Sequence, residues 1–480
     1  AFSKKAGEQI NDLAKRNVAH TTGLSLIEKE DGGPRHAFVT SSFNTGWMHG
    51  DIKGALLSDT TAESLTANTN LASACVQDGT SRLTSETYTN GATSWQMVDN
   101  AGTANGYVVV AFKGLTIGQS YFVSMTWDNN AALLSGYEHR VSHKNGLAGE
   151  NPTNFTQWNK TNGSSETLIG VFTAQSVNDD DLVIYVNAIT LNVSNFNIRA
   201  VDDEDRSINN HGLAVYGTIT KSAVATGAEL VGYSGFSATD NLLQPYNSGL
   251  NVGTGEFSYI AWVKKATLST NHYVFDRNDG SAESNRLSFI INQDGQLYLY
   301  SGNGGATSRS DSGVFVGSSA WRMVMVKRVS GVIIFGLDGE EYTSTTTAGN
   351  WSTTNITGSG DENLFIGQYG GSGVPGNVAY NADYGIGEIA NVRLSSSVPS
   401  AEQFKKMYDD EKHLYMENAK ATLYGSSDAV TALAFDDTTE LLHVGTSSGR
   451  SEFQGLRRIN KTTDAVTAAI SASNDLVAEK

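Results

Sequence analysis

Only one cysteine, Cys75, occurs among the 480 residues of the chain. A single thiol can form neither an internal disulfide framework nor a cysteine-based zinc site, so we expect Cys75 to be a small buried hydrophobic residue. Basic residues are also scarce, since 33 Lys and Arg stand against 50 Asp and Glu. The resulting net charge of −17 disfavours nucleic acid and anionic membranes as partners.

Long apolar runs are missing as well. No run approaches the ~20 residues that a membrane helix needs, so no membrane insertion is expected. The first residues lead into an amphipathic stretch and lack the apolar core of a signal peptide. Because the sequence starts at Ala1 instead of Met, we expect a fragment or a processed product.

Glycine and small polar residues are abundant instead. Fifty glycines, frequent Thr, Ser and Asn, and only 17% charged residues are typical of many short strands joined by tight turns. The composition therefore predicts an all-β protein, and the length predicts two to four domains. Composition and pattern divide the chain into residues 1–60, 61–205, 206–400 and 401–480.

Region 1–60 begins with apolar residues at helical spacing over residues 2–17, which predicts a short amphipathic helix followed by strands. The Thr-, Ala- and Asn-rich composition after Asp59 marks its end.

Region 61–205 contains two pairs of successive predicted strands, 107–112 with 114–127 and 182–186 with 191–199. Its segments "GLTIGQSYFVSMTW" and "VSNFNIRAV" are similar to carbohydrate-binding jelly-roll modules of secreted glycanases.

Region 206–400 has the strongest strand pattern. Residues 257–264 alternate as a half-buried strand does, and the Asp-Gly at 294–295 predicts a hairpin. A second hairpin is expected from residues 321–327 and 332–339. With "LFIG" at 364–367 and "GEIANVRL" at 387–394, this order of strands resembles laminin-G-like (concanavalin A-type) β-sandwiches.

That resemblance implies one antiparallel two-sheet sandwich closed by the strand 387–394. We expect Trp262, Trp321 and Ile389 to be buried between its sheets. In the closing strand, Ile389, Val392 and Leu394 should point inward. The remaining side chains of that strand should face water or the neighbouring strand; these are Glu388, Asn391 and Arg393.

Region 401–480 opens with a helix predicted over residues 401–417. We expect Phe404, Met407 and Tyr408 on its apolar face, and a solvated charge run without a pocket at Asp409, Asp410 and Glu411. Residues 429–446 follow as a strand, an acidic turn and another strand, which is typical of a β-propeller blade. Residues 443–459 also resemble 36–56. Either the two sandwiches are insertions between blades of one propeller, or this similarity arises by chance.

Longer phrases resemble large tail-associated structural proteins of marine bacteriophages. They are "TGWMHGDIKGALLSDT" at 45–60, "LAVYGTITKSAVATGAELVGYSGFSATDNLLQPYN" at 213–247, and residues 417–459. The resemblance implies two antiparallel sandwiches, a jelly roll and a laminin-G-like domain, flanked by propeller-like segments and two short helices. It also implies an extracellular virion protein of a tail fibre, spike or nozzle. Its expected partners are other tail proteins, further copies of itself in a homo-oligomer, and host-surface glycan.

Catalytic residues are not predicted. Retaining glycanases with this type of sandwich place two carboxylates on the same face of one strand. The nearest candidates, Asp361-Glu362 and Glu340-Glu341, are adjacent and point to opposite faces, and the closing strand offers only Glu388. We interpret the acidic run 202–205 as a linker instead of a cation site. An active site formed between subunits would escape this reasoning.

Calcium is the one cofactor left open. Modules of these types often hold Ca²⁺ with oxygen ligands from loops at the rim. Loop residues that could do so are Asp276, Asn278, Asp279, Asn285 and Asp311. Asp and Asn also favour turns for backbone reasons alone.

Glycan sites commonly present an aromatic ring to a sugar, assisted by amide and carboxylate groups. The candidates in region 61–205 are Trp127, Tyr137 and Trp158, and those in the Gly/Asn-rich loop before the closing strand are Tyr369, Tyr380, Asp383 and Tyr384.

The sequence leaves two functions open for the chain. One is a non-catalytic virion tail component that displays glycan-binding sandwiches. The alternative is a tail polysaccharide depolymerase, or a secreted glycoside hydrolase with accessory modules.

Overall fold

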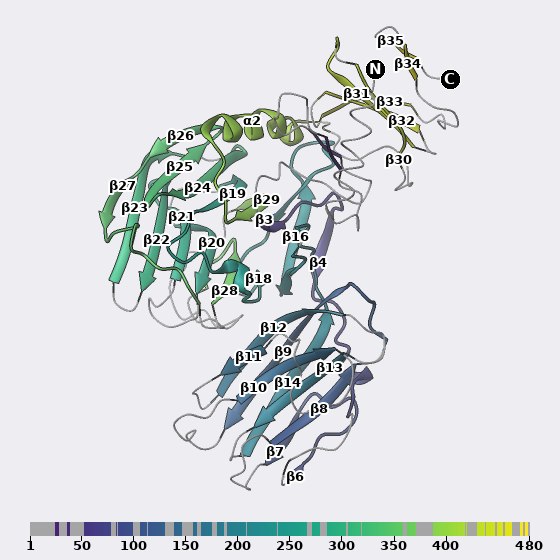
Figure 1. Cartoon of the computed structure of the whole chain (residues 1–480), viewed down its shortest axis with the longest axis vertical. Coiled ribbons are helices and arrows are strands. Elements are labelled where there is room, and N and C mark those ends of the chain that lie inside the picture. The colour runs from purple at the N-terminus through teal and green to yellow at the C-terminus, as the bar shows by residue number, and fades with distance from the viewer. Residues whose placement is uncertain are drawn as a thin grey trace.

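The computed structural model is built almost entirely from antiparallel strands, which confirms the all-β prediction (Figure 1). One α-helix, α2 (Ala401–Glu411), occurs in the part of the chain that the structure describes. That part comprises residues 25–27, 36–38, 52–77, 83, 85–98, 106–112, 114–129, 139–145, 157–160, 165–174, 180–186, 190–207, 209–237, 239–265, 271–278, 286–303, 306–317, 319–358, 362–370, 387–417, 419, 430–436, 438–446, 449–454, 457–462, 471–473 and 476–478. The helix predicted over residues 2–17 lies outside it.

The first sandwich, at the bottom of Figure 1, consists of two five-stranded sheets. One has the order β11 (Gln157–Lys160), β10 (His139–Asn145), β13 (Asp180–Val186), β8 (Gly106–Phe112), β5 (Val76–Gln77). The other has the order β12 (Ser165–Thr173), β9 (Ser120–Asn129), β14 (Thr190–Ala200), β7 (Trp95–Val98), β6 (Ser85–Glu86). The strands expected as successive pairs, β8 with β9 and β13 with β14, therefore lie in opposite sheets, because the chain crosses over the core between them.

The core of the first sandwich takes side chains from both sheets, including Val110 and Ile184 from one and Val123 and Met125 from the other. Cys75 lies in this core and is 1% exposed, as predicted. Burial raises the pKa of its thiol to about 12, which keeps the thiol protonated and unreactive.

The second sandwich is larger. Its first sheet has eight strands in the order β15 (Ala214–Tyr216), β18 (Asn241–Gln244), β28 (Asn363–Ile366), β20 (His272–Asn278), β21 (Arg286–Ile291), β22 (Gln296–Asn303), β23 (Ala306–Phe315), β27 (Thr345–Ala348). Its second sheet contains β26 (Glu340–Thr343), β25 (Val332–Leu337), β24 (Arg322–Val329), β19 (Phe257–Lys264), β29 (Glu388–Ser395), β17 (Val231–Ser234), β16 (Thr218–Ala223) and β4 (Glu63–Thr66), and β3 (Ile52–Leu56) also pairs with β29. Both predicted hairpins, β21–β22 and β24–β25, are present.

Strands β3 and β4 change the expected domain boundaries. Residues 52–66 were assigned partly to region 1–60 and partly to region 61–205, yet both strands belong to the second sandwich. Antiparallel pairing with β29 and β16 brings them there from more than 150 residues away. The composition change after Asp59 marks the loop between these two strands and not a domain boundary.

Two tryptophans that were expected between the sheets lie on the outer face of β19 and its sheet. Phe257, Tyr259, Ala261 and Val263 point into the core between the sheets, so the alternating side chains face outward. Trp262 is buried on this outer face beneath α2, and Trp321 is half-buried beside it. Only Ile389 of the three predicted residues lies between the sheets.

The outer face of the second sheet is covered by α2 and the following turn η4 (Lys412–Tyr415), which lie across the top of the second sandwich in Figure 1. The helix begins at a capping box in which the Ser400 hydroxyl accepts from the Gln403 amide and the Gln403 side chain accepts from the Ser400 amide. Phe404 and Met407 are buried as predicted, and Tyr408 is half-buried against the same cluster.

The closing strand β29 confirms the inward positions of Ile389, Val392 and Leu394. Alternation is broken between the first two because Asn391 has φ +48° and adds a residue to the strand opposite β19. The expectation that Asn391 and Arg393 face water or a neighbouring strand is wrong. Both side chains are buried under η4 and the end of α2, where their partners are Tyr415 and Glu411.

Glu411 is likewise not part of a solvated charge run, because it is fully buried. Its Oε2 accepts from Arg393 Nη2 at 2.6 Å and from Trp262 Nε1 at 2.8 Å. Asp409 and Asp410, in contrast, form ion pairs with Lys405 and Lys406 at the surface. Together with β26 they line an open hollow of about 510 Å³, where no pocket was expected.

In region 401–480, the strands β30 (Val430–Asp436), β31 (Leu441–Thr446), β32 (Gly449–Gln454) and β33 (Arg457–Thr462) form one four-stranded antiparallel meander. The two strands predicted within 429–446 are present as β30 and β31, and a four-stranded meander is compatible with a propeller blade, whose assignment stays a prediction. Two hairpins, β1 (Ser25–Ile27) with β2 (His36–Phe38) and β34 (Ser471–Ser473) with β35 (Leu476–Ala478), are described outside the sandwiches.

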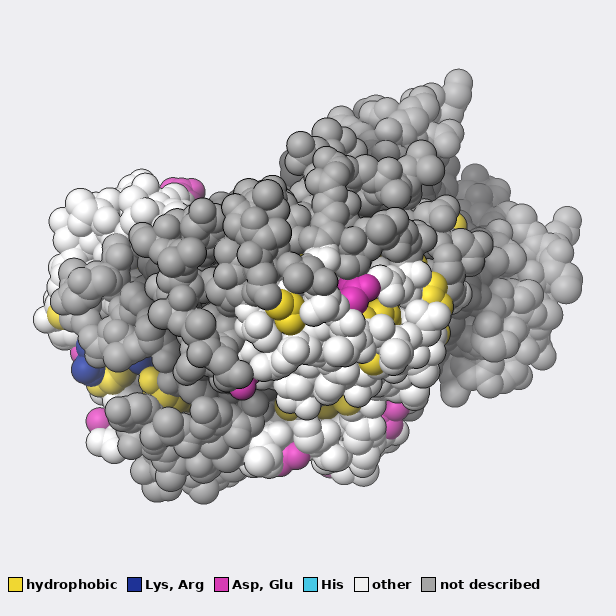
Figure 2. Space-filling view, turned by 90° about the horizontal axis from the view of Figure 1, so that it is seen from below, with side chains coloured by type: hydrophobic (Ala, Val, Ile, Leu, Met, Phe, Trp, Pro, Cys, Tyr) yellow, Lys and Arg dark blue, Asp and Glu magenta, His cyan; other side chains and the backbone are white. Residues whose placement is uncertain are grey.

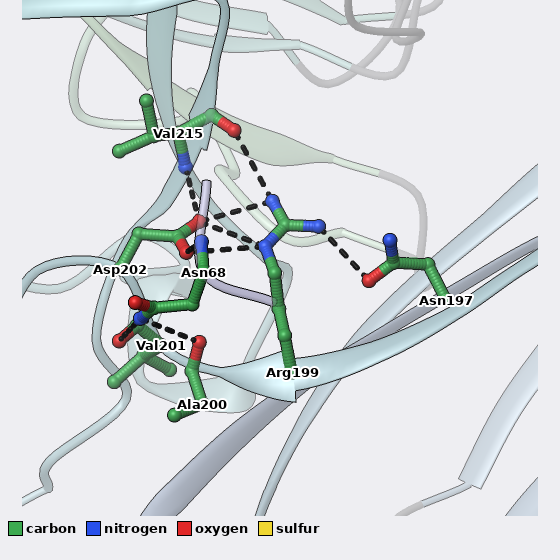
Figure 3. Close-up of polar contacts among 7 residues, drawn as sticks. All are labelled: Asn68, Asn197, Arg199, Ala200, Val201, Asp202 and Val215. Carbon is green, nitrogen blue, oxygen red and sulfur yellow. Dashed lines mark hydrogen bonds and ion pairs between the residues drawn. The ribbon is translucent and has the colours of Figure 1, made fainter. Parts of the chain in front are cut away.

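The two sandwiches are joined through a buried ion pair, drawn in Figure 3. Asp202 Oδ2 lies 3.0 Å from Arg199 Nη2 and accepts from the amide of Val215 at 2.8 Å, while its Oδ1 accepts from the amide of Asn68. Arg199 Nη2 also donates to the carbonyl of Val215. The acidic run 202–205 is therefore a structured connection between the sandwiches, as its interpretation as a linker implied.

Candidate functional site

The outer face of the eight-stranded sheet carries a group of aromatic and charged side chains. In β21, Leu287 and Phe289 point into the core, so Arg286 and Ser288 point outward. In β22, Leu297 and Leu299 point into the core, so Tyr298 and Tyr300 point outward. Strands β21 and β22 are neighbours, with Ser288 opposite Tyr300, and this register brings the outward side chains together.

Three tyrosines surround Arg286. Its guanidinium carbon lies 4.6 Å from the ring centroid of Tyr369, 5.0 Å from that of Tyr300 and 5.8 Å from that of Tyr273. The rings of Tyr273 and Tyr369 are themselves 5.1 Å apart. We call Arg286, Tyr273, Tyr300 and Tyr369 the Tyr–Arg cluster.

The buried carboxylate of Asp276 holds this cluster in place through hydrogen bonds. It is fully buried, and its Oδ1 accepts from Arg286 Nε at 3.1 Å and from the hydroxyl of Ser288. Its Oδ2 accepts from the amide of Gly370 at 2.8 Å. The carboxylate thus fixes both the arginine and the backbone next to Tyr369.

Burial and charge set the protonation states in the cluster. Burial acts to lower the pKa of Arg286, but the charge of Asp276 together with the interactions of Tyr273 and Tyr369 raises it, so the guanidinium stays charged. Burial raises the pKa of Tyr273 to about 12. At neutral pH the cluster therefore presents a permanent cation and a neutral phenol, which suits binding more than proton transfer.

A second aromatic–arginine pair continues the same face. Arg309 of β23 lies over the ring of Tyr298 at 4.3 Å, and its Nε donates to Asp311 at 3.0 Å. The side chain of Arg309 is 43% exposed. Tyr298 and Tyr300 are two residues apart on one strand, so the pair and the Tyr–Arg cluster form one row of rings and guanidinium groups.

Of the residues predicted to contact glycan, the structure describes the side chains of Tyr369 and Trp127. Tyr369 is half-buried in the Tyr–Arg cluster. The prediction for Trp127 is wrong. This side chain is 3% exposed within the core of the first sandwich, because β9 turns it inward with Val123 and Met125. Trp158 lies in β11, where the structure describes the backbone alone, and the remaining candidates lie outside the described residues; these are Tyr137, Tyr380, Asp383 and Tyr384.

Two of the calcium candidates are buried and a third is paired. Asp276 is bound to Arg286, Asn278 Nδ2 lies 3.5 Å from Asp276 Oδ2, and Asp311 accepts from Arg309. Asp279 and Asn285 lie outside the described residues. Among the residues that are described, no group of three or more His, Cys, Asp or Glu side chains could hold a metal ion. An ion at Asp276 would have to displace the guanidinium of Arg286.

Two of the carboxylates considered for catalysis are ion-paired with lysines. Glu388 Oε1 accepts from Lys264 Nζ at 2.7 Å, and Glu341 Oε1 accepts from Lys327 Nζ at 2.5 Å. Glu340 is exposed on the edge strand β26, Glu362 is fully buried, and Asp361 lies outside the described residues.

Sequence reasoning missed Arg286, Tyr273, Tyr300, Tyr298 and Arg309. The alternation of "QLYLY" at 296–300 places both tyrosines on the face opposite Leu297 and Leu299, and this signal was available. Arg286 carries no such signal, since it is the first residue of its strand.

Comparison with family models identifies the type of domain that the second sandwich contains. Residues 237–404 match the Laminin_G_3 model, described as the concanavalin A-like lectin/glucanases superfamily. The predicted laminin-G-like domain is therefore confirmed. A search of curated proteins finds no match. No helix among the described residues is long and apolar enough to cross a membrane.

Several solved structures are similar to parts of the chain. Domain 4 of an extracellular GH43 arabinanase from Geobacillus stearothermophilus, in complex with arabinotriose, is 15% identical, with 43% of this chain and 92% of that chain covered and a TM-score of 0.32. The CBM40 of an IT-sialidase from Ruminococcus gnavus, bound to α2,3-sialyllactose, is 16% identical (32% and 84% covered, TM-score 0.26). The receptor-binding domain of botulinum neurotoxin C/D mosaic serotype is 11% identical (52% and 59% covered, TM-score 0.29). At these values the three structures assign neither ligand nor activity to this chain.

Proposed function

We propose that this chain is a non-catalytic, glycan-binding component of a bacteriophage virion tail. Its binding surface is the outer face of β20, β21, β22 and β23 in the eight-stranded sheet. The observation that carries the proposal is the row formed by the Tyr–Arg cluster and the Tyr298–Arg309 pair, on a domain that matches a lectin and glucanase superfamily.

The chemistry of this row suits sugars. Tyrosine rings offer flat apolar faces and hydroxyl groups, and guanidinium groups donate to ring oxygens, hydroxyls or carboxylates. Each arginine is held by an aspartate, Arg286 by Asp276 and Arg309 by Asp311, so the row is fixed before a ligand arrives. The local charge is thereby balanced, which favours neutral or weakly charged glycans.

Charge elsewhere also supports an uncharged ligand. On the face seen in Figure 2, acidic side chains are scattered singly among uncharged groups on the described surface, and the basic ones visible lie at one side. A protein of net charge −17 would repel a highly anionic polymer unless a basic patch compensated for it.

The non-catalytic part of the proposal is supported by the described carboxylates. Glu388 and Glu341 are ion-paired to lysines, and Asp276 is buried under Arg286. The alternative, a glycoside hydrolase, requires a carboxylate pair from residues outside the described part or from a second subunit. A reducing-sugar assay on host capsule and lipopolysaccharide separates the two: sustained release of sugar would refute the non-catalytic role.

The binding test uses the whole chain and a panel of immobilised glycans that includes host-surface polysaccharide. Tyr300→Ala and Tyr369→Ala should each weaken binding at least tenfold. Phe315→Ala is the matched control, because Phe315 is an aromatic residue of the same sheet and is 54% exposed, yet is outside the row. Equal binding by all variants would move the ligand away from this face.

The virion assignment rests on the phrases at 45–60, 213–247 and 417–459, and the expected partners are other tail proteins and copies of this chain. It is tested by labelling the protein with antibodies on intact particles. Labelled tails support it, and a signal restricted to particle-free culture fluid contradicts it.

A further inference from the structure

Gly370 lies between the Tyr–Arg cluster and another buried group. On one side its amide donates to Asp276 Oδ2 at 2.8 Å, next to Tyr369. On the other side its backbone packs against the ring of Phe365, so closely that a Cβ at this position would lie 2.2 Å from Cδ2 of that ring. Glycine is therefore required here by close approach alone.

Phe365 belongs to the interface between the two sandwiches. It points outward from β28 and is 3% exposed within a buried cluster that also contains Ala214 and Leu243 of the second sandwich. The same cluster contains Phe122 of β9 and Ile169 of β12, both from the first sandwich. The guanidinium carbon of Arg199 lies over the Phe122 ring, 4.5 Å from its centroid, which ties the cluster to the ion pair of Figure 3.

We infer that the docked first sandwich positions the Tyr369 side of the Tyr–Arg cluster, acting through Phe365 and Gly370. Phe122 and Ile169 fix the Phe365 ring. The ring fixes the backbone at Gly370, and the Gly370 amide completes the hydrogen bonds of Asp276. Asp276 in turn orients Arg286, around which the tyrosines are arranged.

This inference rests on the proposed function only where it concerns ligand affinity. If the row binds glycan, the first sandwich contributes to affinity without touching the ligand, and Phe122, Phe365 and Gly370 are positioning residues. The positioning itself has a readout that needs no ligand, which is the protection of the Gly370 amide against hydrogen exchange.

The first experiment compares Phe122→Ala with Phe172→Ala in the whole chain. Both residues are buried phenylalanines of the first sandwich, but Phe172 lies in that sandwich's own core and not in the interface cluster. We expect Phe122→Ala to speed exchange at Gly370 at least tenfold, and Phe172→Ala to leave it unchanged. Ile169→Ala, a smaller truncation in the same cluster, should give an intermediate effect if Phe122→Ala fails to fold.

The second experiment tests the contact itself. Gly370→Ala should speed exchange in residues 286–288 and weaken glycan binding, because the new Cβ collides with Phe365. Adding Phe365→Leu to that variant makes room for the Cβ and should restore most of the protection.

Two outcomes would overturn the inference: equal effects of Phe122→Ala and Phe172→Ala on Gly370, or no rescue by Phe365→Leu. A chain that binds no glycan but shows the expected exchange pattern would refute the proposed function alone and leave the positioning intact.

Discussion

Trp262 and Glu411 are 149 residues apart in the chain, yet the indole Nε1 donates to the carboxylate Oε2 at 2.8 Å inside the protein. The same oxygen accepts from Arg393, and the indole stacks on Tyr415 with centroids 4.1 Å apart. This buried group attaches α2 and η4 to the outer face of the second sheet, where Trp262 would otherwise meet water.

Truncation of Glu411 tests this attachment. Glu411→Ala leaves the Arg393 guanidinium buried without its partner, so we expect a loss of about 3–5 kcal/mol in the free energy of unfolding. Urea denaturation followed by tryptophan fluorescence measures it. Asp409→Asn, a change two residues away in surface ion pairs, should cost about 0.5 kcal/mol or less. Comparable losses in the two variants would contradict the buried role.

Asp202 is expected to control how the two sandwiches unfold. Asp202→Ala removes the acceptor of the Asn68 and Val215 amides and leaves Arg199 buried and without its carboxylate. We expect a loss of about 3 kcal/mol or more and a separation of one calorimetric transition into two. Glu204→Ala, at an exposed neighbour, should leave the heating curve unchanged; a single unchanged transition in Asp202→Ala would show that the ion pair does not couple the sandwiches.

Stability should depend on pH through Asp203. Burial raises its pKa to about 6 in the folded chain, against the lowering effect of Lys221, with Tyr233, Asp59 and Arg206 also nearby. Because the folded pKa exceeds the unfolded value of 3.8, the folded state binds the proton more tightly. The contribution of this carboxyl to stability is therefore full below about pH 4, falls as the pH rises to about 6, and is lost above that.

Asp203→Asn, which stays neutral, should consequently stabilise the chain at pH 7.5 by an amount on the order of 2 kcal/mol and have little effect at pH 4. Chemical denaturation at the two pH values gives the comparison. Asp240→Asn is the control of opposite sign, because hydrogen bonds from Ser237 and the amide of Thr218 lower the pKa of Asp240. If Asp203→Asn stabilised the chain at pH 4 and not at pH 7.5, the conclusion that folding raises the pKa of Asp203 would be wrong.

Much of the fold could be predicted because it depends on local pattern. The hairpin at 294–295 and the hairpin between 321–327 and 332–339 follow from alternation and turn residues, and alternation within β29 places Val392 and Leu394 on one face. The face of Trp262 could not, because alternation gives the period and not which side of a sheet a helix will cover. The bulge at Asn391 similarly shifts the register in a way that the sequence does not mark.

The candidate site was predicted only in part for the same reason. Tyr369 was expected, and Asp276 was expected in a different role, but their connection runs through the Gly370 amide, 94 residues from Asp276. Arg286 then occupies the carboxylate that a calcium ion would need. Such pairings depend on the tertiary structure and have no signature in the spacing of residues.

Calcium removal should therefore have no effect at Asp276. A site half-saturated at one-thousandth of the added calcium concentration would stabilise the fold by about 4 kcal/mol. We expect the melting temperature to be the same in chelator and in added calcium, as measured by calorimetry. A marked rise with calcium would mean that Arg286 gives way or that ligands outside the described residues hold the ion.

Strands β3 and β4 have a consequence for how this protein can be divided. The second sandwich begins with these two strands, is interrupted after Thr66, and resumes at Ala214 in β15, so the first sandwich is an insertion within it. The inserted module has two covalent tethers to its host, and a protease cut in either one leaves it attached through the other. An expression fragment that starts at residue 206 lacks β3 and β4 and exposes the edges of β29 and β16, and it would be prone to aggregation.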